Sequence, residues 1–359
     1  MNKHPSTPAR GLSIIELMVG LVVGLLVSMA AVNSAQLFGA LQRQGIGTGS
    51  GGANTASVLA AIKNDVANGG LGFFGNLNYL CTTVNMSVAG ALVSDNAAFA
   101  PVQVTRVGNN DRIDIAYGSE VAAGAAVKTS GTSDGTSVAL KTYLPVTANQ
   151  AVLLAAPTVG TPCLLRTVTA TPANPTAAAK ETLTFANTGT YNQATFTTNA
   201  TYPENSLVTL IGTPQWNRYA LNGTDLQLTR MLDGTTVTLL RNVIGLRVMY
   251  GVASATAPVQ TDGSRAPLAA WQKSTDAGWT SVDNTNIGRI KAVQIGIVIR
   301  SAQKEKVNKE SGVCEATPLA AGKPKLFNDV IEPDVTDWTC YRYRTQIVVA
   351  PLRNVIYGL

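Results

Sequence analysis

The stretch "PARGLSIIELMVGLVVGLLVSMAAV", residues 8–32, decides how the rest of this chain is interpreted. Between residues 12 and 32 the only charged side chain is that of Glu16. At 1.5 Å per helical residue, this run has about the length needed to cross the hydrocarbon core of a membrane. Lys3 and Arg10 precede the run, which predicts a cytoplasmic N-terminus and places the bulk of the chain on the opposite side of the membrane.

The carboxylate of Glu16 is the unusual feature of this segment. A charge inside a membrane segment costs about 2.5–3.5 kcal/mol and normally marks a partner. A secretory signal peptide is the alternative, and "SMAAVNSA" offers a weak cleavage site between Ala30 and Ala35, but Glu16 argues against it. Cleavage after Gly11 would instead give Leu12 an α-ammonium, which would neutralise Glu16 of an adjacent subunit during assembly.

Gly11 followed by "LSIIEL" resembles the class III signal of type IV prepilins, in which a basic leader ends in Gly and Glu is the fifth mature residue. Counted from Leu12, Glu16 is that fifth residue. The resemblance implies that residues 1–11 are a leader and that a membrane prepilin peptidase cleaves between Gly11 and Leu12 and methylates the Leu12 amine. Leu12 differs from the commonest Phe at this position, and we expect an apolar residue to be tolerated there.

Residues 12–68 are predicted to form the membrane and assembly helix. The tract "GIGTGSGGA", residues 45–53, opposes helix formation by about 1 kcal/mol per glycine, so the helix is expected to be interrupted or weak there. The helix should resume over "TASVLAAIKNDVAN", residues 55–68, where apolar side chains recur at helical spacing. The predicted core-facing stripe is Leu59, Ile62 and Val66.

Composition favours an exported, strand-rich protein. Charged residues make up 13% of the 359 residues, which is about half of typical usage. The formal net charge is +6, but beyond "KEK" at 304–306 and "YRYR" at 341–344 the sequence has no basic cluster. The charge therefore supports nucleic-acid binding only weakly, and a solvated surface is the preferred interpretation.

The chain contains four cysteines, and an even number in an exported protein predicts disulfides. Their wide spacing, without a CxxC motif, excludes a zinc knuckle. Three pairings exist in principle. Cys314 with Cys340 is favoured because it closes a short loop, and Cys81 with Cys163 then follows by elimination.

Residues 69–359 are predicted to form a β-rich periplasmic head. "VQVTRV" and "RIDIAY" alternate around "GNND" and predict a hairpin over residues 102–117, and "NG" at 222–223 predicts another. "RIKAVQIGIVIRS", residues 289–301, has one nearly all-apolar face and is expected to be a central strand. Residues 119–200 are rich in Ala, Thr and Gly and are interpreted as a variable, loop-rich insertion with some edge strands.

Several C-terminal segments resemble the PilW group of minor pilins: "NRYAL", "RNVIGLRVMYGV", "IGRIKAVQIGIVIRS" and "YRYRTQIVVAPLRN". They resemble the J-type minor pseudopilins of type II secretion less closely. The resemblance covers about residues 8–80 and 200–357 and omits the insertion. It implies an α+β, pilin-like fold, in which a long N-terminal hydrophobic helix packs on a mostly antiparallel β-sheet domain.

The resemblance implies a minor pilin that sits in the inner membrane of a Gram-negative bacterium as a single-pass protein, primes type IV pilus assembly and then lies at the pilus tip. Its partners would be the major pilin, minor pilins of the PilV, PilX and FimU kind, the prepilin peptidase and membrane lipid. Two alternatives remain open. One is a type II secretion pseudopilin. The other is a tip adhesin or DNA-uptake receptor that contacts its ligand through loops of the 119–200 insertion and through Arg342 and Arg344, which share one face of the last strand.

An enzymatic role is not expected. His4 is the only histidine and lies in the predicted leader, so the mature chain has no His base and no Ser-His-Asp triad. The sequence has neither a P-loop nor an HExxH motif, and we expect no cofactor and no metal. The close carboxylate pairs Asp111/Asp114 and Asp334/Asp337 are interpreted as loop and turn residues.

Overall fold

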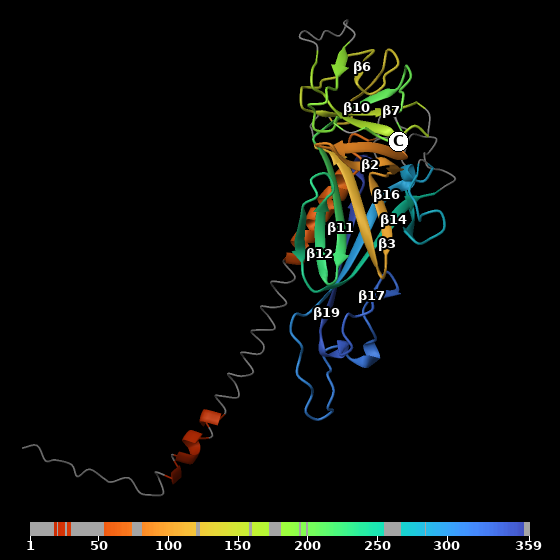
Figure 1. The fold of residues 1–359 in the computed structure, drawn as a ribbon. Helices are drawn as coiled ribbons and strands as arrows, with labels where there is room; N and C mark the ends of the chain where they lie inside the picture. The colour runs from red at the N-terminus through yellow and green to blue at the C-terminus, as the bar shows by residue number, and fades with distance from the viewer. Residues whose placement is uncertain are drawn as a thin grey trace, which may run out of the picture. The chain divides into compact units, whose positions relative to one another are not determined.

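The computed structural model describes residues 18–19, 21–25, 27–29, 54–73, 81–119, 123–157, 160–171, 181–193, 195–198, 200–254, 267–283 and 285–354. The chain separates into two compact units, Met1–Thr55 and Ala56–Leu359. The second unit is a β-rich body in which three larger sheets and one helix are packed (Figure 1).

The described residues before residue 54 are all helical. Their large apolar side chains are between 52% and 66% exposed, and they comprise Met18, Val19, Leu21, Val22, Val23, Leu25, Val27 and Met29. In the part of the chain that the structure describes, no helix is both long enough and apolar enough to span a bilayer. The predicted span over 12–32 lies largely outside the described residues, and the glycine tract over 45–53 lies wholly outside them.

Five antiparallel strands form one sheet in the order β13-β12-β11-β4-β3. Their bounds are Val102–Val107 for β3, Asn110–Gly118 for β4, Pro214–Asn222 for β11, Asp225–Arg230 for β12 and Thr236–Leu240 for β13. Both predicted hairpins are confirmed, since β3 pairs with β4 and β11 pairs with β12 around residues 222–223. Strand alternation gives this sheet an apolar face, on which Val104, Ile113 and Ile115 are fully buried, and a polar face.

Residues 54–68 form a helix, which confirms the helix predicted over 55–68. The predicted stripe is buried, with Leu59 at 5% exposure and Ile62 and Val66 at 0%. These side chains belong to the same hydrophobic cluster as the apolar face of the five-stranded sheet, here called the main core. The helix therefore buries one face against β-structure, as its 3.6-residue periodicity requires.

A four-stranded antiparallel sheet has the order β15-β14-β16-β19. Its bounds are Val243–Ala253 for β14, Leu268–Lys273 for β15, Ile290–Arg300 for β16 and Tyr343–Pro351 for β19, and the short helix η1, Ile287–Arg289, leads into β16. The prediction that residues 289–301 form a central strand is confirmed, because β16 lies between β14 and β19. The connection to β19 holds η2 (Leu319–Ala321), β17 (Lys325–Leu326), β18 (Asp329–Val330) and η3 (Trp338–Cys340).

Six strands form the largest sheet, in the order β2-β1-β8-β7-β10-β5. All of its pairs are antiparallel except β1 with β8. Its bounds are Thr83–Val88 for β1, Ala91–Ala98 for β2, Ala126–Lys128 for β5, Ala151–Ala155 for β7, Cys163–Thr167 for β8 and Leu207–Gly212 for β10. A separate antiparallel pair is formed by β6 (Ser137–Ala139) and β9 (Thr182–Thr184), which come before and after β7 and β8 in the chain.

The six-stranded sheet lies between two hydrophobic cores. On β7, Ala151, Leu153 and Ala155 belong to the main core, whereas Val152 and Leu154 belong to a second core. Strands β7 and β8 are therefore interior strands and not edge strands, so the loop-rich interpretation of residues 119–200 is wrong for them. These short runs are apolar on both faces, and they lack the alternation that marks a half-buried strand in a sequence.

Both cysteine pairs favoured from the sequence are present. Cys81 bonds to Cys163 with 5.3 Å between their Cα atoms, and this bridge joins the approach to β1 to the first residue of β8. Cys314 bonds to Cys340 with 4.7 Å between the Cα atoms, within the long connection from β16 to β19. The first bridge thus fixes the single parallel strand pair of the six-stranded sheet, and the second constrains a segment with little core of its own.

The helix stripe gives a stability prediction. Replacing Ile62 with Ala should lower the free energy of unfolding by about 2–5 kcal/mol, because a fully buried side chain is lost and a cavity remains. Lys63→Ala, at the exposed neighbouring position, should change it by no more than about 0.5 kcal/mol. Denaturant unfolding followed by circular dichroism measures both. Equal effects of the two substitutions would contradict this packing of the helix.

Candidate functional site

One carboxylate on the helix binds two strands of the five-stranded sheet. Asp65 accepts hydrogen bonds from the Tyr117 hydroxyl of β4 at 2.9 Å, and from the Tyr219 hydroxyl and the Asn217 amide of β11 at 2.6 and 2.7 Å. Hydrogen bonds to an ionised acceptor are roughly twice as strong as neutral ones. Because the three donors come from two strands, Asp65 fixes both the rotation of the helix and its position along the sheet.

Asp65 and its three donors are here called the junction. The phenols of Tyr117 and Tyr219 in this junction are held in their protonated form. Burial and, second, the neighbouring Asp65 carboxylate raise the pKa of both Tyr117 and Tyr219 above the usual value of a tyrosine. A phenolate at either position would be repelled by Asp65 and would lose the hydrogen bond that the hydroxyl donates to it. The junction is therefore built from neutral donors around one charged acceptor.

A buried carboxylate at the start of β4 joins this strand to the four-stranded sheet. Asp111, 2% exposed, accepts from Arg106 Nε at 2.6 Å and from the backbone N–H of Val248 in β14 at 2.8 Å. Asn110 Oδ1 accepts from the backbone N–H of Leu246 at 3.0 Å. Burial raises the pKa of Asp111, although the bonds from Val248 and Arg106 oppose that shift.

The polar face of the five-stranded sheet carries one row of polar side chains across all five strands. The register aligns Gln103, Asp114, Arg218, Thr229 and Thr236. Asp114 accepts from Arg218 Nε at 2.6 Å and from Arg112 Nε at 3.1 Å. The predicted loop and turn roles of Asp111 and Asp114 are therefore wrong, because both lie in β4, where each pairs with arginine.

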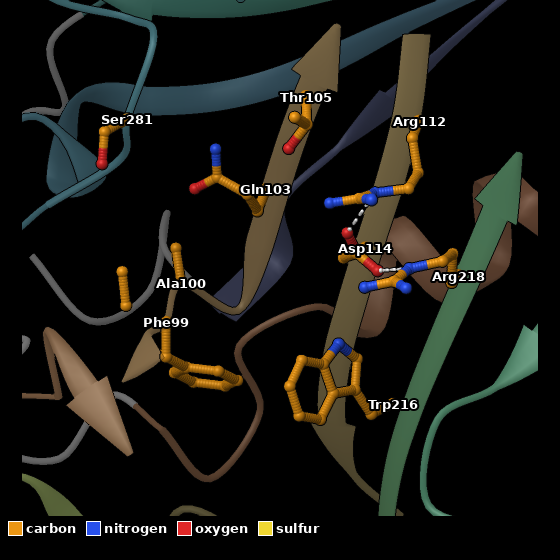
Figure 2. Close-up of a pocket in the computed structure, with 10 residues that line it drawn as sticks. Phe99, Ala100, Gln103, Thr105, Arg112, Asp114, Trp216, Arg218 and Ser281 are labelled. Atoms are coloured by element: carbon orange, nitrogen blue, oxygen red, sulfur yellow. Dashed lines mark hydrogen bonds and ion pairs between the residues drawn. The ribbon is translucent and has the colours of Figure 1, made fainter. Parts of the chain in front are cut away.

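A hollow of about 250 Å³ lies over this row, at its β3 end (Figure 2). Figure 2 shows Arg112 and Arg218 reaching in from neighbouring strands on either side of Asp114. Trp216 lies beside Phe99, with ring centroids 5.6 Å apart in an edge-to-face arrangement. The lining is completed by small and polar residues: Ala98, Ala100, Gln103, Thr105 and Ser281.

The hollow has more hydrogen-bond donors than acceptors. Asp114 takes the Nε atoms of Arg112 and Arg218, and within the described residues no protein acceptor bonds to the Nη atoms of either arginine. Two guanidinium charges face a single carboxylate, so the site retains a positive charge. Over the same described ranges, no group of three His, Cys, Asp or Glu side chains is placed to hold a metal ion.

The residues predicted from the N-terminal motif are not placed by the structure. Gly11, Leu12 and Glu16 lie outside the described residues, so peptidase cleavage, N-methylation and the registry role remain predictions.

The two predicted surface arginines lie at the start of β19, far along the chain from the hollow. Arg342 and Arg344 are both exposed, as predicted, and Arg342 forms an ion pair with Glu305. This pairing offsets the charge of one of the two arginines. The predicted turn carboxylates nearby are also paired, Asp334 with Arg300 at 2.8 Å and Asp337 with Lys304.

Comparison with known proteins gives a family assignment for the C-terminal part. Residues 210–354 match the family model of PilW, the type IV pilus-assembly protein W. This C-terminal region is therefore similar to the PilW family. A solved type IV-like pilin from Thermus thermophilus aligns with 85% of this chain and 97% of its own length, at 6% identity and a TM-score of 0.34, a likeness too low to carry an argument. The search of curated proteins gave no match.

The PilW region confirms the resemblance seen in the C-terminal segments and maps onto two sheets. It contains β11 to β13 of the five-stranded sheet and all of the four-stranded sheet. The helix and the β3–β4 hairpin lie outside it. Asp65, Asp111 and Asp114 therefore join parts of the chain outside the PilW region to strands within it.

Sequence reasoning missed Asp65, Arg112, Trp216 and Arg218. Arg112 and Asp114 do carry a usable signal, since their i, i+2 spacing within a predicted strand places both side chains on one face. No such signal exists for Arg218, because it lies 104 residues from its partner Asp114 and only the sheet register brings them together.

Removing the helix carboxylate should destabilise the second unit. We expect Asp65→Ala to lower the free energy of unfolding by about 1.5–3 kcal/mol, because charge-assisted hydrogen bonds are lost and buried donors are left without an acceptor. Asn64→Ala, at the adjacent exposed position, is the control and should cause no comparable loss. Chemical denaturation tests both variants, and an unchanged midpoint for Asp65→Ala would show that the junction contributes nothing.

The raised tyrosine pKa values predict alkaline sensitivity. Because the pKa of Tyr219 is higher in the folded than in the unfolded chain, the folded state retains a proton that the unfolded state releases above about pH 10. This contribution to stability is complete below about pH 10 and is lost as the pH rises further.

Unfolding measured between neutral pH and about pH 11 should show this loss, and the loss should be shallower in Tyr219→Phe, which cannot ionise at that position. Other tyrosines with raised pKa values, among them Tyr117, Tyr202 and Tyr250, account for the slope that remains. Identical slopes in the variant and the wild type would rule out the contribution of Tyr219.

Proposed function

We propose that this chain is a minor pilin that primes type IV pilus assembly at the inner membrane and is retained at the pilus tip. The observation that carries the proposal is the PilW match over residues 210–354, which associates the chain with the type IV pilus. The prepilin-like segment around Gly11 and Glu16 is independent support, because it lies outside the matched region.

In this proposal the N-terminal segment is the assembly element. Prepilin peptidase removes residues 1–11 and methylates Leu12, and the new Leu12 ammonium of one subunit pairs with Glu16 of its neighbour. Two groups that are costly in a membrane then neutralise each other only when subunits are in register. The exposed apolar side chains of residues 18–29 suit a helix that packs against other apolar helices.

The second unit supplies the head, and within it the helix over residues 54–68 is held firmly against the sheet. Leu59, Ile62 and Val66 bury the helix face in the main core, and Asp65 adds three hydrogen bonds. A head with a fixed internal structure of this kind suits a subunit that must present one surface to partners. The proposed partners are the major pilin and minor pilins of the PilV, PilX and FimU kind.

The proposal assigns the chain no catalytic activity. Its lone histidine, His4, falls in the segment removed with the leader. A role as a type II secretion pseudopilin is disfavoured by the PilW match, whose description names pilus assembly.

The registry role predicts a separable defect. Glu16→Gln should be cleaved by prepilin peptidase like the wild type, since the residues flanking Gly11 are unchanged, but its incorporation into pili and the number of surface pili should fall several-fold. Ser13→Ala is the matched control, because it removes a polar hydroxyl group from the same segment and keeps the carboxylate of Glu16. Immunoblots of leader processing and of sheared pili measure both steps, and wild-type piliation with normal incorporation of Glu16→Gln would refute the registry role.

A further inference from the structure

The hollow on the polar face of the five-stranded sheet has the features of a binding site that the pilus role does not use. Asp114 is nearly buried and holds Arg112 and Arg218 by their Nε atoms, whereas the two arginine side chains remain about 30% exposed. Both guanidinium groups are thereby fixed in orientation with their Nη edges left for a ligand. A guanidinium edge matches the two oxygens of a carboxylate.

The other walls of the hollow suit a ring that has both apolar and hydroxylated surfaces. Trp216, which packs against the buried ring of Phe99, provides an aromatic wall, and in Figure 2 the indole nitrogen of Trp216 lies on the ring edge nearest Arg218. Thr105 and Ser281 add hydroxyl groups on the remaining sides. The volume of about 250 Å³ is below the about 300–1,000 Å³ that drug-sized ligands occupy, which limits the ligand to about one ring.

We propose that this hollow binds the carboxylate-bearing ring of an acidic sugar. The carboxylate lies between Arg112 and Arg218, and the ring contacts Trp216. A bare phosphate or acetate would engage the arginines but would be too small to contact Trp216 and the hydroxyl groups at the same time. A neutral sugar would leave the positive charge uncompensated.

This binding does not depend on whether the chain is incorporated into pili. Arg112 and Arg218 lie on the face of the sheet opposite Ile113 and Ile115, which point to the main core. Neither arginine bonds to Asp65, so their substitution removes none of the three hydrogen bonds at the helix.

The test is a titration of the purified full-length chain, kept in mild detergent because of its apolar segment, with glucuronate, glucose, acetate and inorganic phosphate. Calorimetry gives the affinities, and the indole N–H resonance of Trp216, assigned with Trp216→Phe, reports contact at the hollow. Glucuronate should shift this resonance and bind at least about tenfold more tightly than the other three compounds. Arg112→Gln and Arg218→Gln should each weaken binding about tenfold or more.

Arg230→Gln is the matched control, because Arg230 is an exposed arginine of the same sheet, paired across the register with Asn217 on the helix-facing side. Its affinity for glucuronate should equal that of the wild type, and circular dichroism checks that each variant folds. The proposal is overturned if glucose, acetate or phosphate binds as tightly as glucuronate. It also fails if the wild-type Trp216 resonance does not move, a result that needs no variant.

Discussion

The second unit depends on how a single helix is held against the five-stranded sheet. Leu59, Ile62 and Val66 bury the apolar face of the helix, but apolar contacts alone would allow the helix to slide or rotate by small amounts. Asp65 removes that freedom, because its two oxygens receive donors from β4 and β11 at once. The end of the helix is held as well, since Asn354 donates to the carbonyls of Asn68 and Gly69. A residue that follows β19 thus bonds to the end of the helix over residues 54–68.

The six-stranded sheet solves a different problem, which is how to attach an additional layer to the body formed by the other two large sheets. Strands β7 and β10 alternate their side chains between the main core and the second core, so both faces of the sheet are buried at these two strands. The Cys81–Cys163 bridge crosslinks the layer at its parallel pair, which is held by only two residue pairs in register. Residues 119–200 are therefore part of the folded body, and their second core depends on strand β10 from outside that range.

The polar face of the five-stranded sheet is free of this packing constraint. Its charged row is held together by Asp114, whose two arginine partners offset the cost of burying a carboxylate. Two other carboxylates connect elements instead. Asp65, on the helix, bonds to the opposite face of this sheet, and Asp111, at the start of β4, bonds to the four-stranded sheet. One sheet thus carries connecting side chains on one face and, in our proposal, the two arginines that bind a ligand on the other.

The sequence by itself determined the local features: the apolar N-terminal run with its one carboxylate, the helix stripe at Leu59, Ile62 and Val66, the hairpins, the central strand and the cysteine pairs. Each of these rests on a periodicity or spacing visible within a few tens of residues or, for the cysteines, on their small number. Only the tertiary structure decided that β7 and β8 are interior strands, that Asp65 receives donors from β4 and β11, and that Arg218 meets Asp114. These contacts join residues about 50 to 150 positions apart, through sheet register and packing, and local sequence carries no record of which distant strand becomes a neighbour.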